Sequence, residues 1–465
     1  MSHARRTGLH RLDSLLPWLS LVAVGLWPAT DLLLANPQAD VSSRLILWSL
    51  AILSTAATAA AITFMFARSF GRSMAIVAPA TVAFFCFAWL EPGLRFALAE
   101  VGLDRGAVVA FFVLLGVLVL VLARVSIEQS TRRFLLVIPI FLLSTSGAAA
   151  LISRVSSTPS KSARLDDHAK LAPKFRTKPN VYHFLFDGLA RPDMLRATLG
   201  VDVRNDVEQL QQSGLELAPK VQTRYLTTVA SISGIFNPFA DTTKAQDLVA
   251  SDTPIIQAFR SQGYHYAHYG EVFAFSVCKG NEDRCLNQPS WKLTELDITL
   301  LRKTPLYQLL KKAILAETDS RALLTNLHII VAEGVKRPTF TFVYMVPPHP
   351  PFIFNERCAF DARSAQEFTR WDRAQAPRYV QGYRCVLRAM TSVVQVLIRK
   401  DPSAVIIVSG DHGTMFRRVE PSWSAEAIAE RRPVFLAFRA PDRCSAQLRN
   451  IEVLSNLYPL LMRCL

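Results

Sequence analysis

Two short motifs place metal-binding side chains directly after apolar runs. The run VYHFLF at 181–186 leads into Asp187, and the run AVIIVS at 404–409 leads into Gly-Asp-His-Gly, which contains Asp411 and His412. A glycine beside each motif allows a tight backbone turn close to a ligand. Two carboxylates and an imidazole suit Zn²⁺, Mn²⁺ or Mg²⁺ with one open coordination position. Asp-Gly alone usually marks a turn, so the predicted site for one divalent metal ion rests mainly on the second motif.

A third segment, QTRYLTTVASISGIFNP at 222–238, gathers hydroxyl groups at the start of an apolar helical stretch. They belong to Thr227, Thr228, Ser231 and Ser233. Helix capping explains one hydroxyl at such a position but not four. A helix N-terminus also binds anions such as phosphate, and a metal ion can turn a threonine hydroxyl into an alkoxide nucleophile.

The fourth segment, VPPHPPF at 346–352, follows another apolar run. His349 has two prolines on each side, and they restrict its backbone. A solvent-exposed structural histidine would not need such rigid surroundings. The segment therefore favours a hydrogen-bonding or acid–base role for His349 toward a substrate.

The elements that must position these side chains alternate along the second part of the chain. Apolar runs at 181–186, 339–346, 404–409 and 434–438 are typical of buried strands, and helical spacing extends from 379 to 399. Such strands separated by helices predict an α/β domain with a mostly parallel sheet covered by helices on both faces. Ligands of these sheets bind beyond the carboxyl ends of the strands, where both metal motifs lie.

The first part of the chain has a different composition. Of the 465 residues, 51% are apolar and 19% are charged, and the first 152 hold only 11 of the 52 Lys and Arg residues. Soluble domains average about 25% charged residues, and the composition excludes a disordered, collagen-like or disulfide-scaffold protein. Five runs are long enough to cross a bilayer as helices. They are Leu15–Leu34, Leu45–Ala67, Met74–Leu90, Ala107–Ala123 and Phe134–Ile152.

The basic residues between these runs predict the orientation. Eight lie before the first run or in alternate loops on the same side, and three lie in the other loops. The positive-inside rule then puts the N-terminus in the cytoplasm, and five crossings put everything after Ile152 outside it. A cleaved signal peptide is disfavoured because four more runs follow the first. Asp31 falls within the first run, and we expect it near the outer interface rather than in an intramembrane functional role.

The predicted organisation has three parts. Residues 1–152 form a transmembrane domain of five helices, 153–178 a Ser-, Lys- and Pro-rich linker, and 179–465 an extracytoplasmic catalytic domain. Cys86 lies in the third run, whereas the other six cysteines follow the linker. An even number in an oxidising compartment predicts disulfides. Local pairing gives Cys278–Cys285, Cys358–Cys385 and Cys444–Cys464.

Taken together, the four motif segments resemble the sulfatase-like branch of the alkaline phosphatase superfamily. NVYHFLFDGLAR resembles its first strand and metal-ligand Asp, and GLELAPKVQTRYLTTVASISGIFN its nucleophile segment, in which a Thr precedes a Ser by three. YMVPPHPPF resembles the substrate-histidine loop and VIIVSGDHG the Asp-His metal motif, while GYHYAH and ERRPVFLAFRAP resemble later strands. The resemblance extends from about Pro179 to the C-terminus. With the five spans, the chain is similar to lipoteichoic acid synthases and phosphoethanolamine transferases.

The resemblance implies a chemistry and a role for each residue. In those families a Thr attacks the phosphate of a phospholipid and carries the headgroup to an acceptor. Thr228 is then the nucleophile, because it lies three before Ser231, and Thr227 is the alternative. His349 would contact the transferred group. The implied ligands of one metal ion are Asp187, Thr228, Asp411 and His412.

The chain also departs from its relatives. It lacks the C-x-P-x-R signature of formylglycine sulfatases, which disfavours sulfate ester hydrolysis. The first-strand motif has one Asp where two-metal relatives often have two, so one metal site is expected. The cysteines do not follow the phosphoethanolamine transferase pattern closely, which leaves the headgroup open.

The sequence therefore predicts a bacterial inner-membrane enzyme with a periplasmic or extracellular active site. It would move a phosphoglycerol- or phosphoethanolamine-type headgroup from an anionic or zwitterionic phospholipid to an envelope glycan or lipid. A sulfatase-like ester hydrolase that uses water is the alternative enzyme, and an anchored module that only binds anionic glycan or lipid is the non-enzymatic one. The 41 basic and 30 acidic residues after 152 favour anionic lipid, and the compartment argues against nucleic acid.

Overall fold

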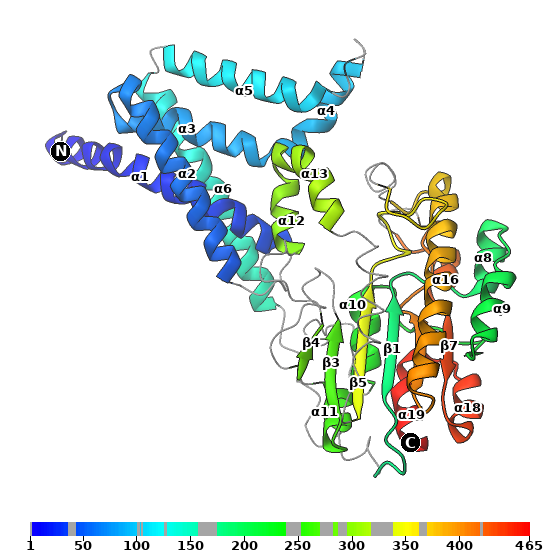
Figure 1. Cartoon of the computed structure of the whole chain (residues 1–465). Coiled ribbons are helices and arrows are strands. Elements are labelled where there is room, and N and C mark those ends of the chain that lie inside the picture. Colours follow the sequence, from blue (N-terminus) through cyan, green and yellow to red (C-terminus); the bar gives the residue numbers. More distant parts are fainter. Residues whose placement is uncertain are drawn as a thin grey trace. The chain divides into compact units, whose positions relative to one another are not determined.

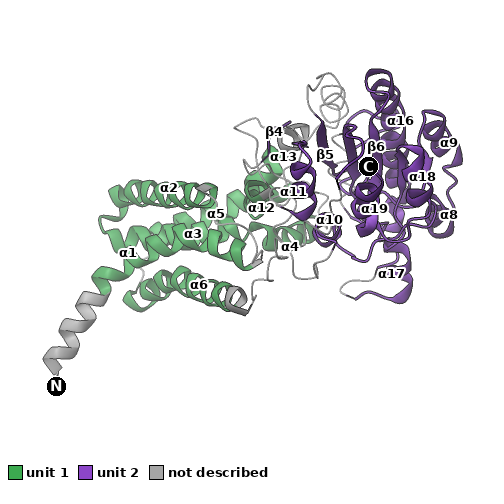
Figure 2. Cartoon of the chain, turned by 90° about the horizontal axis from the view of Figure 1, so that it is seen from below, with its two compact units in different colours: residues 1–158, 293–311 green, residues 159–292, 312–465 purple. Residues whose placement is uncertain are grey.

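The chain folds into two compact units. The computed structural model describes residues 2–35, 43–99, 103, 106–124, 128–156, 174–238, 253–269, 282–286, 295–317, 338–361, 370–418 and 422–465. The first unit comprises residues 1–158 and 293–311, and the second comprises 159–292 and 312–465 (Figure 2). The first unit thus includes a segment, 293–311, that the sequence boundaries assign to the catalytic domain.

The N-terminal unit consists of apolar helices. Among the described residues, four helical stretches are long and apolar enough to cross a membrane, and α3 with α4, bent by 75°, makes a fifth if the pair is one broken span. The span predicted at Met74–Leu90 falls on this bent pair, and α3 ends at its C-cap Cys86. The helices are α1 (Ser2–Ala35), α2 (Ser43–Ala67), α3 (Phe70–Phe85), α4 (Phe87–Ala99), α5 (Ala107–Arg124) and α6 (Gln129–Ser156).

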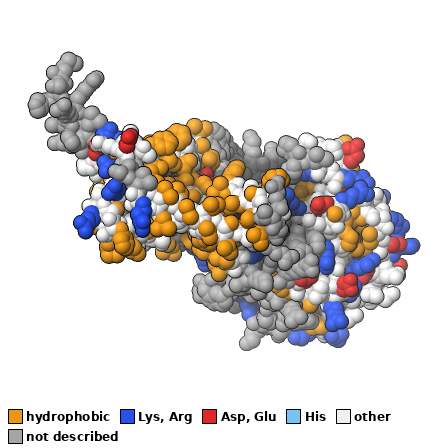
Figure 3. Space-filling view, turned by 90° about the horizontal axis from the view of Figure 1, so that it is seen from above, with side chains coloured by type: hydrophobic (Ala, Val, Ile, Leu, Met, Phe, Trp, Pro, Cys, Tyr) orange, Lys and Arg blue, Asp and Glu red, His pale blue; other side chains and the backbone are white. Residues whose placement is uncertain are grey.

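Two later helices, α12 (Glu295–Arg302) and α13 (Pro305–Glu317), follow β4 in the chain. The buried carboxylate of Asp297 in α12 accepts hydrogen bonds from Arg44 Nη1 at 2.5 Å and Trp48 Nε1 at 2.6 Å. Asp31 forms an ion pair with Lys303. Asp13 and Glu91 also form ion pairs, with Arg133 and Arg95. Hydrophobic side chains cover much of the surface of these helices (Figure 3).

The second unit, called the catalytic unit after its predicted role, is built on one sheet whose described strands have the order β2-β7-β6-β1-β5-β3-β4. Figure 1 labels β1, β3, β4, β5 and β7. β1 pairs in parallel with both β5 and β6, whereas β7 runs antiparallel to β6 and to β2. The predicted mostly parallel sheet is thus confirmed, with two antiparallel pairings at one side. The strands are β1 (Val181–Phe186), β2 (Glu216–Leu217), β3 (His265–Tyr269), β4 (Arg284–Cys285), β5 (Thr339–Met345), β6 (Val405–Gly410) and β7 (Leu436–Arg439).

Helices cover both faces of this sheet, because the strands are apolar on both faces. In β1, Val181 and Leu185 point into one core cluster, and Tyr182, Phe184 and Phe186 point into the other. The first cluster includes α10 (Thr228–Phe236), α11 (Pro254–Ser261), α18 (Asp442–Arg449) and α19 (Leu457–Cys464). The second includes α8 (Pro192–Leu199), α9 (Arg204–Gln212) and α16 (Ala376–Lys400).

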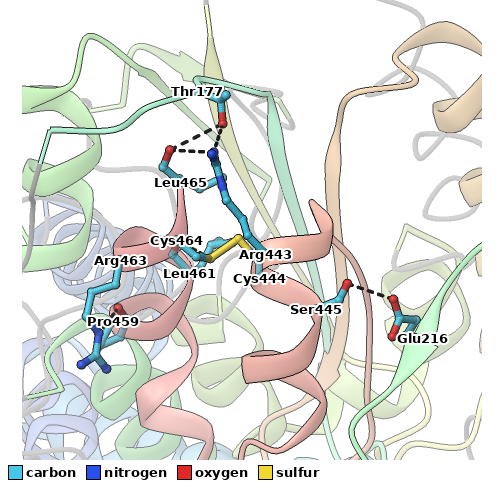
Figure 4. Close-up of a disulfide and its surroundings, with 10 residues drawn as sticks. All are labelled: Thr177, Glu216, Arg443, Cys444, Ser445, Pro459, Leu461, Arg463, Cys464 and Leu465. Carbon is cyan, nitrogen blue, oxygen red and sulfur yellow. Dashed lines mark hydrogen bonds between the residues drawn. A yellow bond between two sulfur atoms is a disulfide. The ribbon is translucent and has the colours of Figure 1, made fainter.

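Two of the three predicted disulfides are confirmed. Cys358 is bonded to Cys385, and Cys444 to Cys464 (Figure 4). Cys285 is also disulfide-bonded, but its predicted partner, Cys278, lies outside the described residues. Beside the Cys444–Cys464 bond, Arg443 Nη2 donates to Thr177 Oγ1 at 2.6 Å and to the Leu465 carbonyl at 3.0 Å. These contacts tie the end of the chain to the segment that leads into β1. The predicted linker at 153–178 lies mostly outside the described residues.

Candidate active site

The carboxyl ends of β1 and β6 bring the two metal motifs together. Phe186 in β1 lies opposite Gly410 in β6, so Asp187 and Asp411 leave neighbouring strands at the same level. The Asp187 amide donates to the Met345 carbonyl at 2.8 Å. This hydrogen bond to β5, the strand on the other side of β1, fixes the turn after β1. Parallel pairing thus explains how residues more than 200 positions apart converge.

Asp187, Asp411 and His412 form a buried group of potential metal ligands. One ligand atom from each lies within 4.8 Å of the others. His412 Nε2 lies 3.3 Å from Asp187 Oδ1 and 3.1 Å from Asp411 Oδ2. Asp411 Oδ2 is buried and has no hydrogen-bond partner in the part of the chain that the structure describes, a costly arrangement for a carboxylate oxygen. Convergent donors with an unsatisfied oxygen fit a divalent cation.

Hydrogen bonds orient two of these ligands. The Asp411 Oδ1 atom accepts from the backbone amides of Gly188 at 2.9 Å and His412 at 2.8 Å. His412 Nδ1 lies 3.1 Å from the Gly413 carbonyl, which can only accept, so Nδ1 carries the proton. His412 Nε2 is therefore the unprotonated nitrogen that points into the group, as a metal-ligating histidine requires.

Thr228 lies at the same group. Its hydroxyl donates to Asp187 Oδ2 at 3.3 Å and lies 3.0 Å from His412 Nε2. Thr228 is the first residue of α10, whereas Thr227 is the residue before the helix and is exposed. Ser231 instead faces Thr223, with 3.0 Å between the two hydroxyl oxygens. The structure thus brings Thr228, and not Thr227, to Asp187, Asp411 and His412.

A buried arginine also enters the group. The Arg431 Nη2 donates to His412 Nε2 at 2.7 Å, while Nη1 donates to the Gly413 carbonyl at 3.1 Å and Nε to the Leu226 carbonyl at 3.0 Å. Arg431 ends α17 (Ala425–Arg431), and its guanidinium lies 5.9 Å from the centre of the Trp371 ring. Two carbonyls and an aromatic face therefore hold one positive charge beside the two buried carboxylates.

His349 lies at the edge of the group. Its Nε2 is 4.0 Å from Asp187 Oδ1 and accepts a hydrogen bond from Trp371 Nε1 at 3.3 Å. Its Nδ1 donates to the Pro350 carbonyl at 2.8 Å. The tryptophan and the proline-rich loop thus set the orientation of the imidazole ring. Gly188, with a φ of +69°, approaches this Trp371 ring so closely that a Cβ would lie 3.2 Å from it.

Burial changes the protonation of these groups. Burial raises the pKa of Asp187, and it raises the pKa of Asp411, where the neighbouring Asp187 charge adds to the effect. Burial, and secondarily the Arg431 charge, lowers the pKa of His412 well below its ordinary value and that of His349 to about 4. The two imidazoles are thus neutral near pH 7, and the carboxylates gain from any cation that binds between them.

The catalytic unit matches a known family. The family model described as Sulfatase matches residues 179–447, more than half of the 465 residues. The chain belongs to the sulfatase family. No curated protein matches the sequence of this sulfatase-family enzyme.

Several solved structures are similar to this sulfatase-family chain. The integral membrane lipooligosaccharide phosphoethanolamine transferase A of Neisseria meningitidis is 13% identical, with 97% of this chain and 95% of that chain covered and a TM-score of 0.39. The periplasmic domain of EptC from Escherichia coli is 10% identical, with 62% and 82% covered and a TM-score of 0.39. A phosphonate monoester hydrolase of Agrobacterium radiobacter is 13% identical, with 60% and 72% covered and a TM-score of 0.38.

Three side chains at the site of this sulfatase-family enzyme were not predicted from the sequence. Arg431 and Trp371 contact His412 and His349, as described above. Tyr344, the last residue but one of the apolar strand β5, donates its hydroxyl to Asp187 Oδ2 at 2.6 Å. Its position two residues before the proline-rich loop was the available signal, since a tyrosine in a fully buried strand needs a partner for its hydroxyl.

Proposed function

We propose that this chain is a membrane-anchored, metal-dependent transferase that moves a phospho-alcohol headgroup, of the phosphoglycerol or phosphoethanolamine type, from a phospholipid to an envelope acceptor. The observation that carries the proposal is the Thr228 hydroxyl, 3.0 Å from His412 Nε2 and 3.3 Å from Asp187 Oδ2 at the start of α10. The N-terminus of a helix favours an anion such as a phosphoryl group. The apolar helices of the other unit would keep the enzyme in the bilayer that contains the lipid.

The chain's own groups can carry the transfer in two displacements. Thr228 Oγ1 attacks the phosphorus, and the bond from phosphorus to the lipid alcohol breaks as the alcohol leaves with a proton. Because the Thr228 hydroxyl donates to Asp187, that carboxylate is positioned to receive the threonine proton. The carboxylate passes this proton to the departing lipid alcohol. An acceptor alcohol then attacks the phosphothreonine, the bond from phosphorus to Thr228 Oγ1 breaks, and the proton of the acceptor returns to Thr228 through the same carboxylate. A divalent ion (Zn²⁺, Mn²⁺ or Mg²⁺) held by Asp187, Thr228, Asp411 and His412 would lower the hydroxyl pKa and neutralise phosphoryl charge.

The charges of the site favour a phosphodiester substrate. Asp187 and Asp411 supply two negative charges, Arg431 supplies one positive charge, and a divalent ion supplies two, which leaves a net charge of +1. A phospholipid diester carries one negative charge at its bridging phosphate, whereas a phosphate monoester carries nearly two. In this proposal Arg431 contacts a phosphoryl oxygen, and His349, neutral and held by Trp371, contacts the headgroup being transferred.

The proposed location is the inner membrane of a bacterium, with the N-terminus in the cytoplasm and the catalytic unit outside. Five crossings require α3 and α4 to act as one broken span; with four crossings the two ends of the chain would lie on the same side. A C-terminal alkaline phosphatase fusion is expected to be active and a fluorescent-protein fusion dark. The reverse pattern would place the catalytic unit in the cytoplasm.

The mechanism is tested by mass spectrometry of the full chain after incubation with phosphatidylethanolamine or phosphatidylglycerol. A phosphoethanolamine or phosphoglycerol adduct on Thr228 is expected, and its mass identifies the headgroup. Thr228→Ala should lose the adduct, whereas Thr227→Ala, the matched control, should keep it. Rapid release of free phospho-alcohol without an acceptor would identify a hydrolase instead. Full activity of Thr228→Ala would contradict the covalent mechanism.

A further inference from the structure

The catalytic unit contains a polar cavity. Several of the residues that line it lie close in the sequence to Thr228, the proposed nucleophile. The volume of the cavity is about 600 Å³, within the range of small-molecule sites. Most of its lining is polar or charged, which suits a charged ligand better than an apolar one. The lining residues are Arg191, Pro219, Lys220, Gln222, Thr223, Arg224, Arg432, Glu452 and Val453.

The charge of this cavity is mostly positive. Arg191 is used within the protein, because Nε and Nη2 donate to Asp193 and Nη1 to the Val221 carbonyl. Lys220, Arg224 and Arg432 are exposed and make no ion pair with any residue that the structure describes. Glu452 is the one carboxylate in the lining. Three cations thus remain against one anion.

The backbone beneath these cations is fixed on both sides. The Thr223 amide donates to the Arg432 carbonyl at 2.8 Å. On the other side, the Gln222 amide donates to the Glu452 carbonyl and its carbonyl accepts from the Leu454 amide, both at 2.9 Å. The cationic side chains therefore extend from a preorganised crossing of three segments, which lowers the entropic cost of binding.

The same backbone leads directly into the active site. Arg224 precedes Thr228 by four residues, so their Cα atoms lie within about 14 Å of each other even in a fully extended chain. Arg432 follows Arg431, whose guanidinium contacts His412. A ligand of sugar-phosphate size held in the cavity can therefore extend toward the nucleophile.

We infer that this cavity binds the phosphate group of a second substrate, the acceptor, and holds it beside the phosphothreonine. The inference rests on the proposed transferase function and adds a phosphate-bearing acceptor to it. A phosphate group meets two arginines and a lysine there, the side chains best suited to bind it. A phosphorylated envelope glycan and a phospholipid headgroup both offer this chemistry.

Binding of glucose 6-phosphate to the full chain tests the inference. The protein is placed in phosphatidylcholine nanodiscs and titrated by calorimetry. The double variant Lys220→Gln with Arg224→Gln is expected to bind at least about tenfold more weakly, and wild-type binding should weaken as salt screens the exposed cations. Arg399→Gln with Lys400→Gln removes the same charge from the end of α16 and should bind like wild type. Equal affinities for all three proteins overturn the inference.

Two further measurements complete the test. One distinguishes the two sources of phosphate, and the other separates the cavity from the proposed covalent mechanism. In nanodiscs that contain phosphatidylglycerol, a persisting difference between wild type and the double variant assigns the cavity to a phosphorylated glycan. A difference seen only in phosphatidylcholine assigns it to a phospholipid headgroup already present in the bilayer. Thr228→Ala, which cannot turn over, should still bind the probe. The cavity is thus tested whether or not the covalent mechanism is correct.

Discussion

Asp297 in the N-terminal unit and Asp411 in the catalytic unit are both buried carboxylates, but their surroundings differ. Asp297 accepts hydrogen bonds from Arg44 at 2.5 Å and Trp48 at 2.6 Å, one to each oxygen. One oxygen of Asp411 accepts hydrogen bonds from two backbone amides. The other lacks a hydrogen-bond partner among the described residues and lies next to the lone pair of His412. The protein stabilises the first carboxylate by itself and leaves the second dependent on a cation.

The largest expected effect of this difference is on catalysis. Asp411→Asn removes a charged ligand while keeping the size of the side chain, so turnover of the phospholipid should fall by at least about 10³-fold. Affinity for Zn²⁺, measured by calorimetry, should fall by at least tenfold. Asp297→Asn, the matched control, should change neither quantity by more than about twofold. Unchanged zinc affinity in Asp411→Asn would argue that the metal lies elsewhere.

A second prediction concerns Arg431. Its Nη2 donates a hydrogen bond to His412 Nε2, the nitrogen that would bind a metal ion. Arg431→Gln removes a positive charge from the site, so zinc affinity should stay equal or increase. Turnover should nevertheless fall by about 10- to 100-fold if Arg431 contacts a phosphoryl oxygen. Arg431→Lys should recover part of the loss, because lysine keeps the charge but cannot replace all three hydrogen bonds of the guanidinium. A parallel loss of zinc affinity and turnover would show that Arg431 only supports the metal ligands.

Arg431 also shows why part of the site could not be predicted from the sequence. Asp187, Asp411 and His412 directly follow apolar strands, and parallel pairing places such residues at one edge of the sheet. Arg431 instead comes from the end of a helix, where a basic residue normally caps carbonyls or faces water. Only the tertiary fold turns its guanidinium inward.

The bend between α3 and α4 is hidden for a different reason. The residues around Cys86 are as apolar as the rest of the run, and hydropathy reports the length of an apolar segment but not its direction. The strands β1, β5, β6 and β7 were predicted because each lies in a short apolar run, whereas β2 and β4 are two residues long and contain a charged side chain each, so no apolar run marks them. The cysteine pairs at 358–385 and 444–464 were predicted by pairing cysteines that are neighbours in the sequence. This rule would have failed if the cysteines paired over longer separations.

The third prediction is that the same change, Asp to Asn, alters the free energy of unfolding in opposite directions at the two carboxylates. Without metal, Asp411→Asn should raise the free energy of unfolding by about 1 kcal/mol, because it removes one of two neighbouring buried charges. Asp297→Asn should lower it by about 1 kcal/mol, since the partly exposed Arg44 loses a charged partner. Thermal unfolding of metal-free protein in detergent measures both changes. Reactivity of Cys86, the free cysteine among the described residues, reports unfolding of the N-terminal unit. Changes of the same sign in both variants would contradict the contrast.

The last expected effect depends on pH and comes from His183, a buried polar residue in β1 with a hydrogen-bond partner at each ring nitrogen. Its Nδ1 lies 2.6 Å from the Tyr458 hydroxyl and its Nε2 lies 2.8 Å from Ser409 Oγ. Burial lowers the pKa of His183 to about 3, whereas in the unfolded chain it is about 6.5. Below pH 6.5 the unfolded state therefore gains a proton that the folded state does not bind. The stabilising contribution is complete above that pH and is lost toward pH 3, at up to about 1.4 kcal/mol per pH unit.

Two variants test this pH dependence. His183→Gln should flatten the loss of unfolding free energy between pH 7 and pH 5, by about 2 kcal/mol relative to wild type. Tyr458→Phe removes the hydrogen bond but keeps the histidine, so it should lower stability at every pH and keep the wild-type slope. An unchanged slope in His183→Gln would mean that His183 is protonated in the folded state. The expected result would distinguish two kinds of buried polar side chain. His183 has its hydrogen bonds and lowers stability only in acid, whereas Asp411 lowers stability until a cation binds.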